Sequence, residues 1–490
     1  MKIAFLASEV APYAKTGGLA DVAQALPAAL AGAGLDIAVF MPFYRSVRAA
    51  GLTLVRALDN LPMAWRGGST GLTVWADPSH PYPVCFIEHP GYFERSDGAG
   101  LYGTPSGDYP DNGERFAFFA RAVLAALKAL PFEAEILHAN DWQTALAPAY
   151  LRHILAEDPF YARIRSVYTI HNLAYQGLFP PSILTDAGLP DRLFRMEDME
   201  FWGQASFMKA GILYADAVTT VSPRYSREIL TPEFGQGLDG LLRARAGALS
   251  GIRNGIDKDA WNPALGQAIA APFSAADPSG KAACRSDLLA AFGLPPARRE
   301  EPIAGLVARL AEQKGVDILI EALDGIMALG VKLIVLGTGD PKLEAALRAA
   351  RDRYPSFLGL RLGFDEALAR KVYAGSDLFL IPSRYEPCGL TQMIAMAYGA
   401  APVARATGGL DDTVRAYEAA TKTGTGIKFE APTAEALLDA VRRAVRILRS
   451  KPDREALVRN AMTADFSWRE PAAEYEALYR KLTKADSEIL

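Results

Sequence analysis

The tetrapeptide Thr-Gly-Gly-Leu occurs twice in the chain, at residues 16–19 and 407–410. Each copy follows an apolar run and precedes a helix-like run, so each is expected at a strand-to-helix turn. Glycines there let a ligand approach the backbone, and free N–H groups at a helix start attract an anion. Lys15 precedes the first copy and Ala406 the second, so only the first turn has its own cation. The residues predicted to face a phosphate or a sugar are Gly17, Gly18 and the following Asp21 in the first copy, and Thr407, Gly408 and Gly409 in the second.

Acidic, imidazole and aromatic side chains follow two other strand-like runs in the first half. Asp141 and Trp142 come after residues 136–139, and His171 ends the run 167–171. Their strand-end positions make them site candidates. Three structural alternatives stay open, because Asp141 suits a helix N-cap, His171 a packed strand end and Trp142 a core.

Two cations and a carboxylate follow strand-like runs in the second half. Arg309 and Lys314 suit a diphosphate, since Arg binds oxygens bidentately and Lys supplies a point charge. An ion-pair network with Glu312 is the alternative. Glu386 suits sugar hydroxyls, and the helix start after it offers N–H groups to a phosphate. The residues of that helix start are Gly389, Leu390 and Thr391.

Two short motifs are weak. Residues 337–340, Gly-Thr-Gly-Asp, lack the third glycine of a dinucleotide fingerprint, so they give poor support for NAD. Residues 257–259, Asp-Lys-Asp, match a metal-binding pattern that arises often by chance, and we interpret them as a turn.

Short apolar runs alternate with Ala- and Leu-rich helical runs through most of the chain, which predicts an α/β fold with parallel sheets. Ligands of such sheets bind beyond the carboxyl ends of the strands, where the candidate residues fall. Residues 51–115 are instead rich in Gly, Pro, Tyr and Trp, and predict an insertion with hairpins and a mobile loop around 98–112. The strands expected in the first half are 3–7, 37–41, 136–139, 167–171 and 218–222.

A turn at residues 254–257, followed by an Ala-, Pro- and Ser-rich stretch, marks the expected domain boundary. After residue 431 the chain is expected to be helical throughout. Tyr475 and Tyr479 lie four residues apart, and we expect the helix face that they share to be buried. The strands expected in the second half are 303–308, 333–337, 359–362, 378–382 and 402–404.

Bulk properties narrow the function classes. The 490 residues are too many for one core, and a net charge of −4 gives no general attraction to nucleic acid or to an anionic membrane. Three distant cysteines argue against a disulfide framework or a zinc site. No signal-peptide pattern or membrane span is evident, so we expect a soluble cytoplasmic protein. The oligomeric state is not readable from the sequence.

Together the motifs resemble those of the bacterial and plant glycogen and starch synthases, in order and over nearly the whole chain. The resemblance implies a GT-B fold, in which two Rossmann-like domains with parallel sheets face each other across a cleft. It implies a retaining glycogen synthase that transfers glucose from ADP-glucose to the non-reducing 4-hydroxyl of an α-1,4-glucan, with ADP as product, no cofactor and no metal. The motifs that carry the match are residues 15–19, 138–142, 170–172, 254–257, 309–315, 386–390 and 407–410.

The resemblance also assigns domains and roles. Residues 1–253 are the acceptor-side domain, 254–467 bind the nucleotide sugar, and the helix 468–490 crosses back to the first domain. Asn254 and Trp142 become substrate-binding candidates, with Trp142 a platform for the glucan. Contacts to the diphosphate and the sugar fall to Lys15, Gly18, Arg309, Lys314, Gly408 and Gly409. Glucosyl contacts fall to Asp141, His171, whose carbonyl would lie near the anomeric carbon, and Glu386.

Two positions depart from the family pattern. Many related glycosyltransferases have a second glutamate eight residues after the first, but this chain has Ile394, so ribose recognition must come from elsewhere. Phe364 stands where related synthases have a tyrosine, and its side chain has no hydroxyl to make a contact there.

The mechanism follows as a hypothesis. Arg309 and Lys314 stabilise the leaving ADP, mainly in the transition state. Retention without an evident nucleophile suggests attack from the leaving-group face, and a covalent intermediate on Glu386 is the alternative. Because Lys15 and Arg309 belong to different domains, we expect ADP to compact the protein.

Two other function classes fit less well. An NAD-dependent oxidoreductase needs a complete glycine fingerprint and a ribose-binding acid, and neither is found. A non-catalytic glucan- or nucleotide-binding protein has no reason to keep Lys15, Arg309, Lys314 and Glu386 together.

Overall fold

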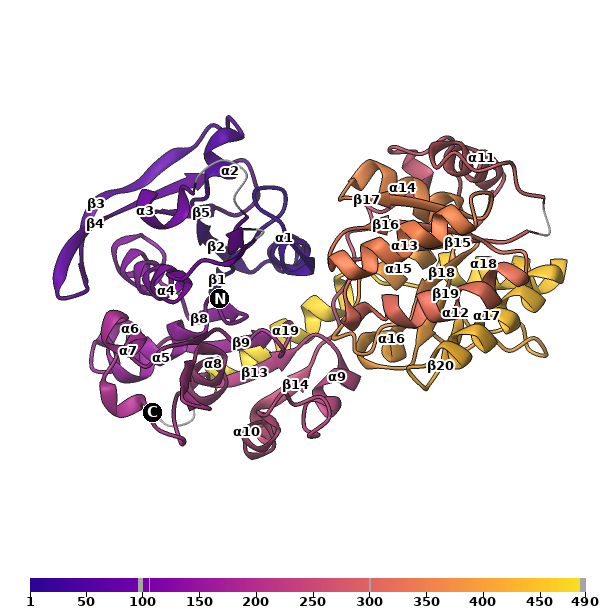
Figure 1. Ribbon diagram of the computed structural model, residues 1–490. Coiled ribbons are helices and arrows are strands. Elements are labelled where there is room, and N and C mark those ends of the chain that lie inside the picture. The colour runs from indigo at the N-terminus through magenta and orange to yellow at the C-terminus, as the bar shows by residue number, and fades with distance from the viewer. Residues whose placement is uncertain (96–99, 105, 299–300, 485–490) are drawn as a thin grey trace. The chain divides into compact units, whose positions relative to one another are not determined.

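The chain divides into two compact units, which we describe separately. Unit 1 comprises Met1–Gly255 and Trp468–Leu490, and unit 2 comprises Ile256–Ser467. The computed structural model describes residues 1–95, 100–104, 106–298 and 301–484 (Figure 1). Each unit has its own large sheet, mixed in unit 1 and parallel in unit 2, and its own apolar core. The division falls close to the boundaries that the sequence suggests.

The described residues of unit 1 form a nine-stranded sheet. Its central strands are buried on both faces, which explains their continuous apolar runs. The five strands expected in the first half are all present, with ends shifted slightly. In spatial order the strands are β14 (Leu249–Gly251), β13 (Ala217–Thr220), β9 (Arg165–Ile170), β8 (Ile136–Asn140), β1 (Lys2–Leu6), β2 (Asp36–Pro42), β5 (Val84–Glu88), β4 (Gly68–Asp77) and β3 (Val55–Trp65).

The stretch expected as an insertion belongs to this sheet. Strand β5 pairs in parallel with β2, and β3 and β4 form an antiparallel hairpin at the sheet edge (Figure 1). The loop expected to be mobile, residues 98–112, lies partly outside the described residues. Its described part contains β6 (Gly103–Thr104) and β7 (Gly107–Asp108), and Asn112 Nδ2 donates to the Tyr102 carbonyl at 2.8 Å.

A second, smaller sheet in unit 1 was not foreseen. Strand β12 (Gln204–Ser206) pairs antiparallel with both β10 (Leu178–Phe179) and β11 (Glu200–Phe201). These strands are too short to show a period. The helices of unit 1 are α1 (Gly18–Gly32), α2 (Arg45–Ala49), α3 (Pro90–Phe93), α4 (Asn112–Ala129), α5 (Leu146–His153), α6 (Pro159–Ala162), α7 (Ile183–Asp186), α8 (Phe207–Tyr214), α9 (Pro223–Glu228), α10 (Asp239–Ala244) and α19 (Arg469–Lys484).

The C-terminal helix α19 packs into the core of unit 1, as its aromatic spacing predicts. Tyr475 and Tyr479 are both buried. The Tyr479 hydroxyl and His138 Nδ1, on β8, lie 2.7 Å apart, and the His138 ring lies 5.4 Å from the Tyr475 ring. Figure 1 shows α19 in yellow among the strands of unit 1.

Unit 2 contains a six-stranded parallel sheet within its described residues. The five strands expected in the second half are present, and the short β20 is an additional edge strand. The spatial order is β17 (Leu358–Leu362), β16 (Lys332–Gly337), β15 (Ile303–Val307), β18 (Leu378–Ile381), β19 (Ala401–Arg405) and β20 (Ile427–Phe429). The helices are α11 (Lys281–Ala291), α12 (Val316–Ala328), α13 (Pro341–Arg353), α14 (Glu366–Gly375), α15 (Thr391–Ala397), α16 (Gly408–Thr413), α17 (Ala434–Arg449) and α18 (Lys451–Thr463).

Both large sheets reverse their strand order at a central strand. In unit 1, β1 lies between β2 and β8, and in unit 2, β15 lies between β16 and β18. The crevice beyond the carboxyl ends of strands at such a reversal is where open α/β sheets bind ligands. Candidate residues follow the two strands that flank each crevice, β1 and β8 in unit 1 and β15 and β18 in unit 2. No helix of the described ranges is long and apolar enough to cross a membrane.

Candidate active site

The first glycine turn lies after β1 and opens helix α1. Residues 15–18 are exposed, and no atom lies within 4 Å of the position that a Cβ on Gly17 would take. Lys15 Nζ donates to Asp21 Oδ1 at 2.6 Å, so Asp21 holds the lysine over the start of the helix. The Cα side of Gly17 is therefore unobstructed.

Glu9 completes this turn, although no motif in the sequence predicts a role for it. Its buried carboxylate accepts hydrogen bonds from the backbone N–H groups of Thr16 at 2.5 Å and Gly17 at 3.2 Å. It also accepts the hydroxyls of Thr16 and Tyr102, both at 2.6 Å. Gly17 was expected to face an anionic ligand, but its N–H group binds an internal carboxylate. The sequence does contain a signal for Glu9, because it is an acidic residue three positions after the end of a buried strand.

Asp141 follows β8 and has a left-handed backbone conformation, with φ of 55°. Its Oδ1 accepts the N–H groups of His171 at 2.7 Å and Asn172 at 3.4 Å. Helix α5 begins later, at Leu146, so the N-cap alternative is wrong. Burial raises the pKa of Asp141 to about 7; the two N–H donors lower it, and the charge of Glu9 raises it further.

His171, after β9, is a neutral imidazole in a defined orientation. Burial lowers its pKa to about 3. Its Nε2 lies 2.9 Å from Asn140 Oδ1, while Asn140 Nδ2 donates to the Leu6 carbonyl at 2.9 Å. Because that second bond fixes the amide, Asn140 Oδ1 must accept from Nε2–H, which leaves His171 Nδ1 as an acceptor. An acceptor nitrogen suits a sugar hydroxyl.

Trp142 is half-buried in an aromatic cluster. Its ring centroid lies 5.1 Å from that of Phe116 and 5.6 Å from that of Phe179. A Cβ on Gly177 would lie 2.6 Å from Trp142 Cε3. Much of the indole therefore packs against protein, which favours the core alternative over a fully exposed platform.

In unit 2, Lys314 and Glu386 form an ion pair. Lys314 Nζ donates to both carboxylate oxygens of Glu386, at 2.9 and 2.6 Å, and Ser383 Oγ donates to Oε2 at 3.0 Å. The Lys314 ammonium thus binds the Glu386 carboxylate, which was expected to bind the sugar. The alternative network with Glu312 is wrong for Lys314, because Glu312 contacts Arg384 instead.

Arg309 lies exposed between β15 and the short helical turn Glu312–Lys314. Its Nη2 donates to Gln313 Oε1 at 3.2 Å. A guanidinium just beyond a strand end can bind phosphate oxygens bidentately, which suits a diphosphate.

The second glycine turn is closed rather than open. A Cβ on Gly408, whose φ is 44°, would lie 2.0 Å from the Glu386 carbonyl oxygen, and one on Gly409 would lie 2.0 Å from that of Cys388. The Gly409 N–H donates to the Glu386 carbonyl at 3.1 Å. The Gly409 N–H was predicted to face a phosphate, but in the structure it bonds to a backbone carbonyl instead. Thr407 and these glycines hold the backbone that carries Glu386.

The helix start after Glu386 has the predicted position. Gly389 has a φ of 70°, Leu390 is the N-cap and Thr391 begins α15. Gln392 Nε2 donates to the Gly389 carbonyl at 2.6 Å and fixes this turn. Gly389 and Leu390 therefore precede α15, and Thr391 is its first residue.

The remaining candidates lie in different surroundings. Asn254 is buried at the end of unit 1, and its Oδ1 has no hydrogen-bond partner among the described protein atoms. Ile394 is buried in α15, whereas Phe364 is 78% exposed after β17. Asp340 caps α13 and Asp257 caps a turn, which supports the structural reading of both weak motifs.

The chain matches known families over most of its length. A family model described as starch synthase catalytic domain matches residues 2–244, and one described as glycosyl transferases group 1 matches residues 301–446. A glycogen synthase from Anaeromyxobacter dehalogenans (strain 2CP-C) is 51% identical over 484 residues, 98% of this chain and 100% of that protein. One from Syntrophotalea carbinolica is 48% identical, over 98% and 99% of the two chains. The chain belongs to the glycogen synthase family.

A solved structure agrees with this assignment. The catalytic domain of starch synthase IV from Arabidopsis thaliana, bound to ADP and acarbose, matches with a TM-score of 0.91 and 34% identity, over 98% of this chain and 99% of that one. The predicted GT-B fold class and the family resemblance are confirmed. As a member of the glycogen synthase family, the chain is a glucosyltransferase.

Proposed function

We propose that the chain transfers glucose from ADP-glucose to the non-reducing 4-hydroxyl of an α-1,4-glucan, with retention of the α configuration and release of ADP. Glycogen synthases that match the whole chain support the reaction. The starch synthase with ADP and acarbose bound supports an adenine nucleotide donor and a glucan acceptor.

The observation that carries this proposal is the placement of complementary groups at the strand-order reversals. Unit 1 offers a cation, Lys15, with sugar acceptors on Asp141 and His171 beyond neighbouring strands. Unit 2 offers Arg309 and the Lys314–Glu386 pair beyond β15 and β18. Cations suit the diphosphate, and fixed acceptors suit glucosyl hydroxyls.

The chemistry follows from charge development. When the bond between glucose and phosphate breaks, positive charge grows on the sugar and negative charge on ADP. Arg309 stabilises the leaving phosphate, and Lys314 does so while it orients Glu386. The departing phosphate takes the proton of the attacking hydroxyl on the same face of the sugar.

Glu386 positions the sugar in this proposal. Both of its carboxylate oxygens already accept from Lys314, and one also accepts from Ser383. The rival mechanism makes Glu386 a covalent nucleophile. Mass spectrometry of enzyme quenched during turnover separates the two, because a glucosyl adduct on Glu386 supports only the rival.

The deciding assay incubates the protein with ADP-glucose and glycogen and measures ADP release together with glucan growth. UDP-glucose in parallel defines the donor preference. Equal amounts of ADP and transferred glucose, in a new α-1,4 linkage, support the proposal. ADP release without glucan growth contradicts it.

We further propose that the reaction needs no metal ion and takes place in the cytoplasm. The diphosphate charge is met by Arg309, Lys314 and Lys15, so EDTA should leave the initial rate unchanged. No disulfide joins Cys85, Cys284 or Cys388, and all three are buried, as suits a reducing compartment.

A further inference from the structure

Trp202 is an outlier in both exposure and backbone conformation. Its side chain is 83% exposed, and its φ is 52°. It occupies the first position of the two-residue turn between β11 and β12, where Gly, Asn or Asp is usual. An exposed indole gains nothing from burial, and a bulky residue in the left-handed region costs free energy. Folding of unit 1 therefore gives no reason for a tryptophan here.

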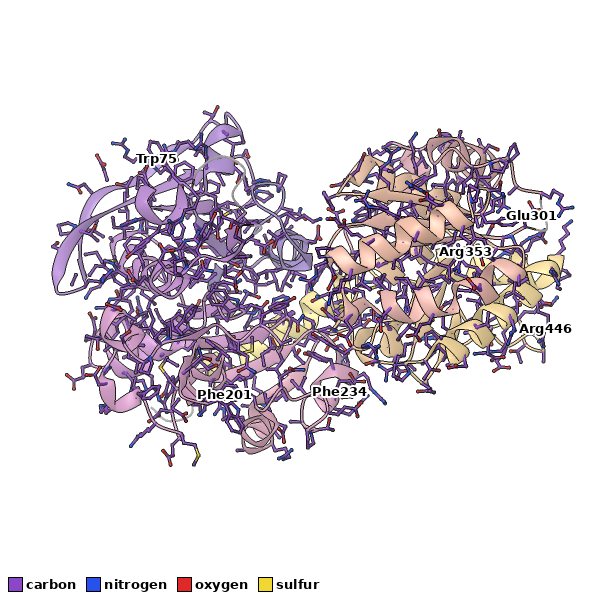
Figure 2. All side chains as sticks on the ribbon, viewed as in Figure 1. Trp75, Phe201, Phe234, Glu301, Arg353 and Arg446 are labelled. Atoms are coloured by element: carbon purple, nitrogen blue, oxygen red, sulfur yellow. The ribbon has the colours of Figure 1, made fainter. Side chains whose placement is uncertain are left out.

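The hairpin that presents Trp202 is firmly held. Glu200 Oε1 accepts the N–H of Gly203 at 2.7 Å, so the carboxylate closes the turn. The buried Lys209 Nζ donates to the carbonyls of Glu200 and Met196 at the base of the hairpin. Phe201, labelled in Figure 2, is half-buried. Its ring lies 6.3 Å from the Trp202 ring, at 82°. The indole is thus presented on a rigid support.

A second segment with left-handed backbone lies against the Phe201 and Trp202 rings. Gln236 has a φ of 51° and Gly237 one of 80°. A Cβ on Gly237 would lie 3.0 Å from Phe201 Cζ and 3.6 Å from Trp202 Nε1, so a glycine here brings the backbone next to the indole. Strained residues that gather at one place point to a function rather than to packing.

This surface is continuous with the candidate active site. Gln176 Nε2 donates to the Gln236 carbonyl at 2.9 Å, and its neighbour Tyr175 is 45% exposed. The Tyr175 N–H donates in turn to the carbonyl of Asn172, the residue after His171. Aromatic and amide groups therefore extend from His171 to Trp202. The exposed side chains Tyr175, Gln236, Trp202 and Gln204 carry no charge, and the adjoining Glu200 carboxylate is half-buried and bonded to the Gly203 N–H.

We propose that the surface formed by Tyr175, Gln236, Gly237 and Trp202 binds an α-glucan chain outside the reacting position. A neutral polymer of sugar rings complements an uncharged surface, because the C–H faces of glucose stack on aromatic rings and its hydroxyls bond to amides. This inference rests on the proposed function only for the identity of the glucan. It assigns to Trp202 the acceptor contact that the packed Trp142 offers only in part.

The test compares the full-length protein with Trp202→Ala, Trp202→Phe and the control Met196→Ala, which removes a 74% exposed apolar side chain near the same hairpin. Binding is measured without turnover, as retardation in native gels that contain glycogen. We expect Trp202→Ala to weaken glycogen binding by about 3- to 10-fold. Trp202→Phe should retain most of the binding, and Met196→Ala all of it. In the transferase assay, the KM for glycogen should rise for Trp202→Ala while the KM for ADP-glucose stays within about twofold.

The inference is wrong if glycogen retards Trp202→Ala as much as wild type, or if Met196→Ala weakens glycogen binding as much as Trp202→Ala does. It is also wrong if sedimentation shows a wild-type dimer that Trp202→Ala dissociates without any effect on glycogen binding. The last result assigns the surface to a second copy of the chain. Failure of the proposed function gives a different result. Glycogen binding in the gels then still depends on Trp202, but the protein does not turn over ADP-glucose.

Discussion

Three carboxylates of the candidate site are engaged before any substrate binds. Glu9 accepts backbone N–H groups of the first glycine turn, Asp141 fixes the backbone of His171, and Glu386 pairs with Lys314. Each acid therefore orients another group of the site, besides any contact that it makes to a sugar. Such preorganisation is what an electrostatic mechanism requires.

Arg309 has the clearest predicted effect. We expect Arg309→Ala to lower kcat by about 10²- to 10³-fold, because it removes a donor that stabilises the leaving phosphate. ADP release under saturating substrates measures this loss. The matched control is Arg446→Ala, an exposed arginine on α17 that should leave kcat unchanged (Figure 2). A kcat within a few-fold of wild type for Arg309→Ala contradicts the assignment.

Asp141 predicts a pH dependence of stability. Its pKa is raised to about 7 in the folded protein, so the folded chain binds more protons than the unfolded chain between about pH 4 and pH 7. Stability from this group is therefore lost as the pH rises through that window. Asp141→Asn keeps an Oδ1 acceptor for the His171 N–H and does not titrate.

Thermal unfolding of the two proteins across pH 4 to 8 tests this prediction. We expect the midpoint of Asp141→Asn to exceed that of wild type by about 2 to 4 °C at pH 8, and the difference to vanish near pH 4. Parallel pH profiles of the two midpoints are incompatible with a raised pKa. Activity should fall at every pH if Asp141 binds the sugar.

At the scale of elements, the same tetrapeptide serves two different turns. In the first, the glycines are exposed at the start of a 15-residue helix. In the second, they let one backbone pack on another, directly beneath Glu386. The tetrapeptide alone does not distinguish the exposed turn from the packed turn, because the difference depends on whether another segment of the chain packs against the glycines.

The two turns therefore respond differently to alanine. Gly409→Ala places a Cβ 2.0 Å from a backbone oxygen that has no room to move, and we expect a loss of at least about 2 kcal/mol in the free energy of unfolding. Gly17→Ala meets no atom within 4 Å and has a φ of −154°, so stability should change by less than about 0.5 kcal/mol. Calorimetry of both variants is the measurement. Equal losses would show that the second turn relaxes.

At the scale of the whole molecule, the chain leaves unit 1 near Gly255 and returns to it at Trp468. The returning helix contributes to the core beneath the site, because the Tyr479 hydroxyl bonds to His138 and the other nitrogen of that ring lies 2.6 Å from Thr169 Oγ1. The last helix of the chain is thus part of its first unit.

Removing that hydroxyl should weaken unit 1. Tyr479→Phe leaves His138 Nδ1 without its partner in the core, and we expect a cost of about 1 to 3 kcal/mol. The transition of unit 1 in differential scanning calorimetry reports it. Tyr354→Phe, which removes an exposed hydroxyl bound to Asp324, is the control and should change little. An unchanged unit 1 transition in Tyr479→Phe would mean that water replaces the bond.

ADP should compact the molecule, since its predicted ligands Lys15 and Arg309 belong to different units. Small-angle scattering with and without saturating ADP measures the radius of gyration, and we expect a decrease. Arg309→Ala should reduce that response at the same ADP concentration. If the scattering profiles of wild type with and without ADP superimpose, the prediction that ADP compacts the protein is wrong.

The sequence by itself determined the fold class, the family and the identity of most candidate residues. It did so because parallel strands, being buried on both faces, appear as apolar runs, and because a ligand site in this architecture must follow their carboxyl ends. Tyr475 and Tyr479 showed a buried helix face in the same way, through spacing alone.

The tertiary structure decided which of these groups meet. Glu9 on Thr16 and Gly17, Lys314 on Glu386, and Gly409 against Cys388 are contacts between segments that local patterns do not connect. The small β10–β12–β11 sheet and the exposed Trp202 likewise depend on pairing between very short strands. Hydrogen bonding and packing at a distance along the chain are set by the fold, so residue types and spacing name the candidates but not their partners.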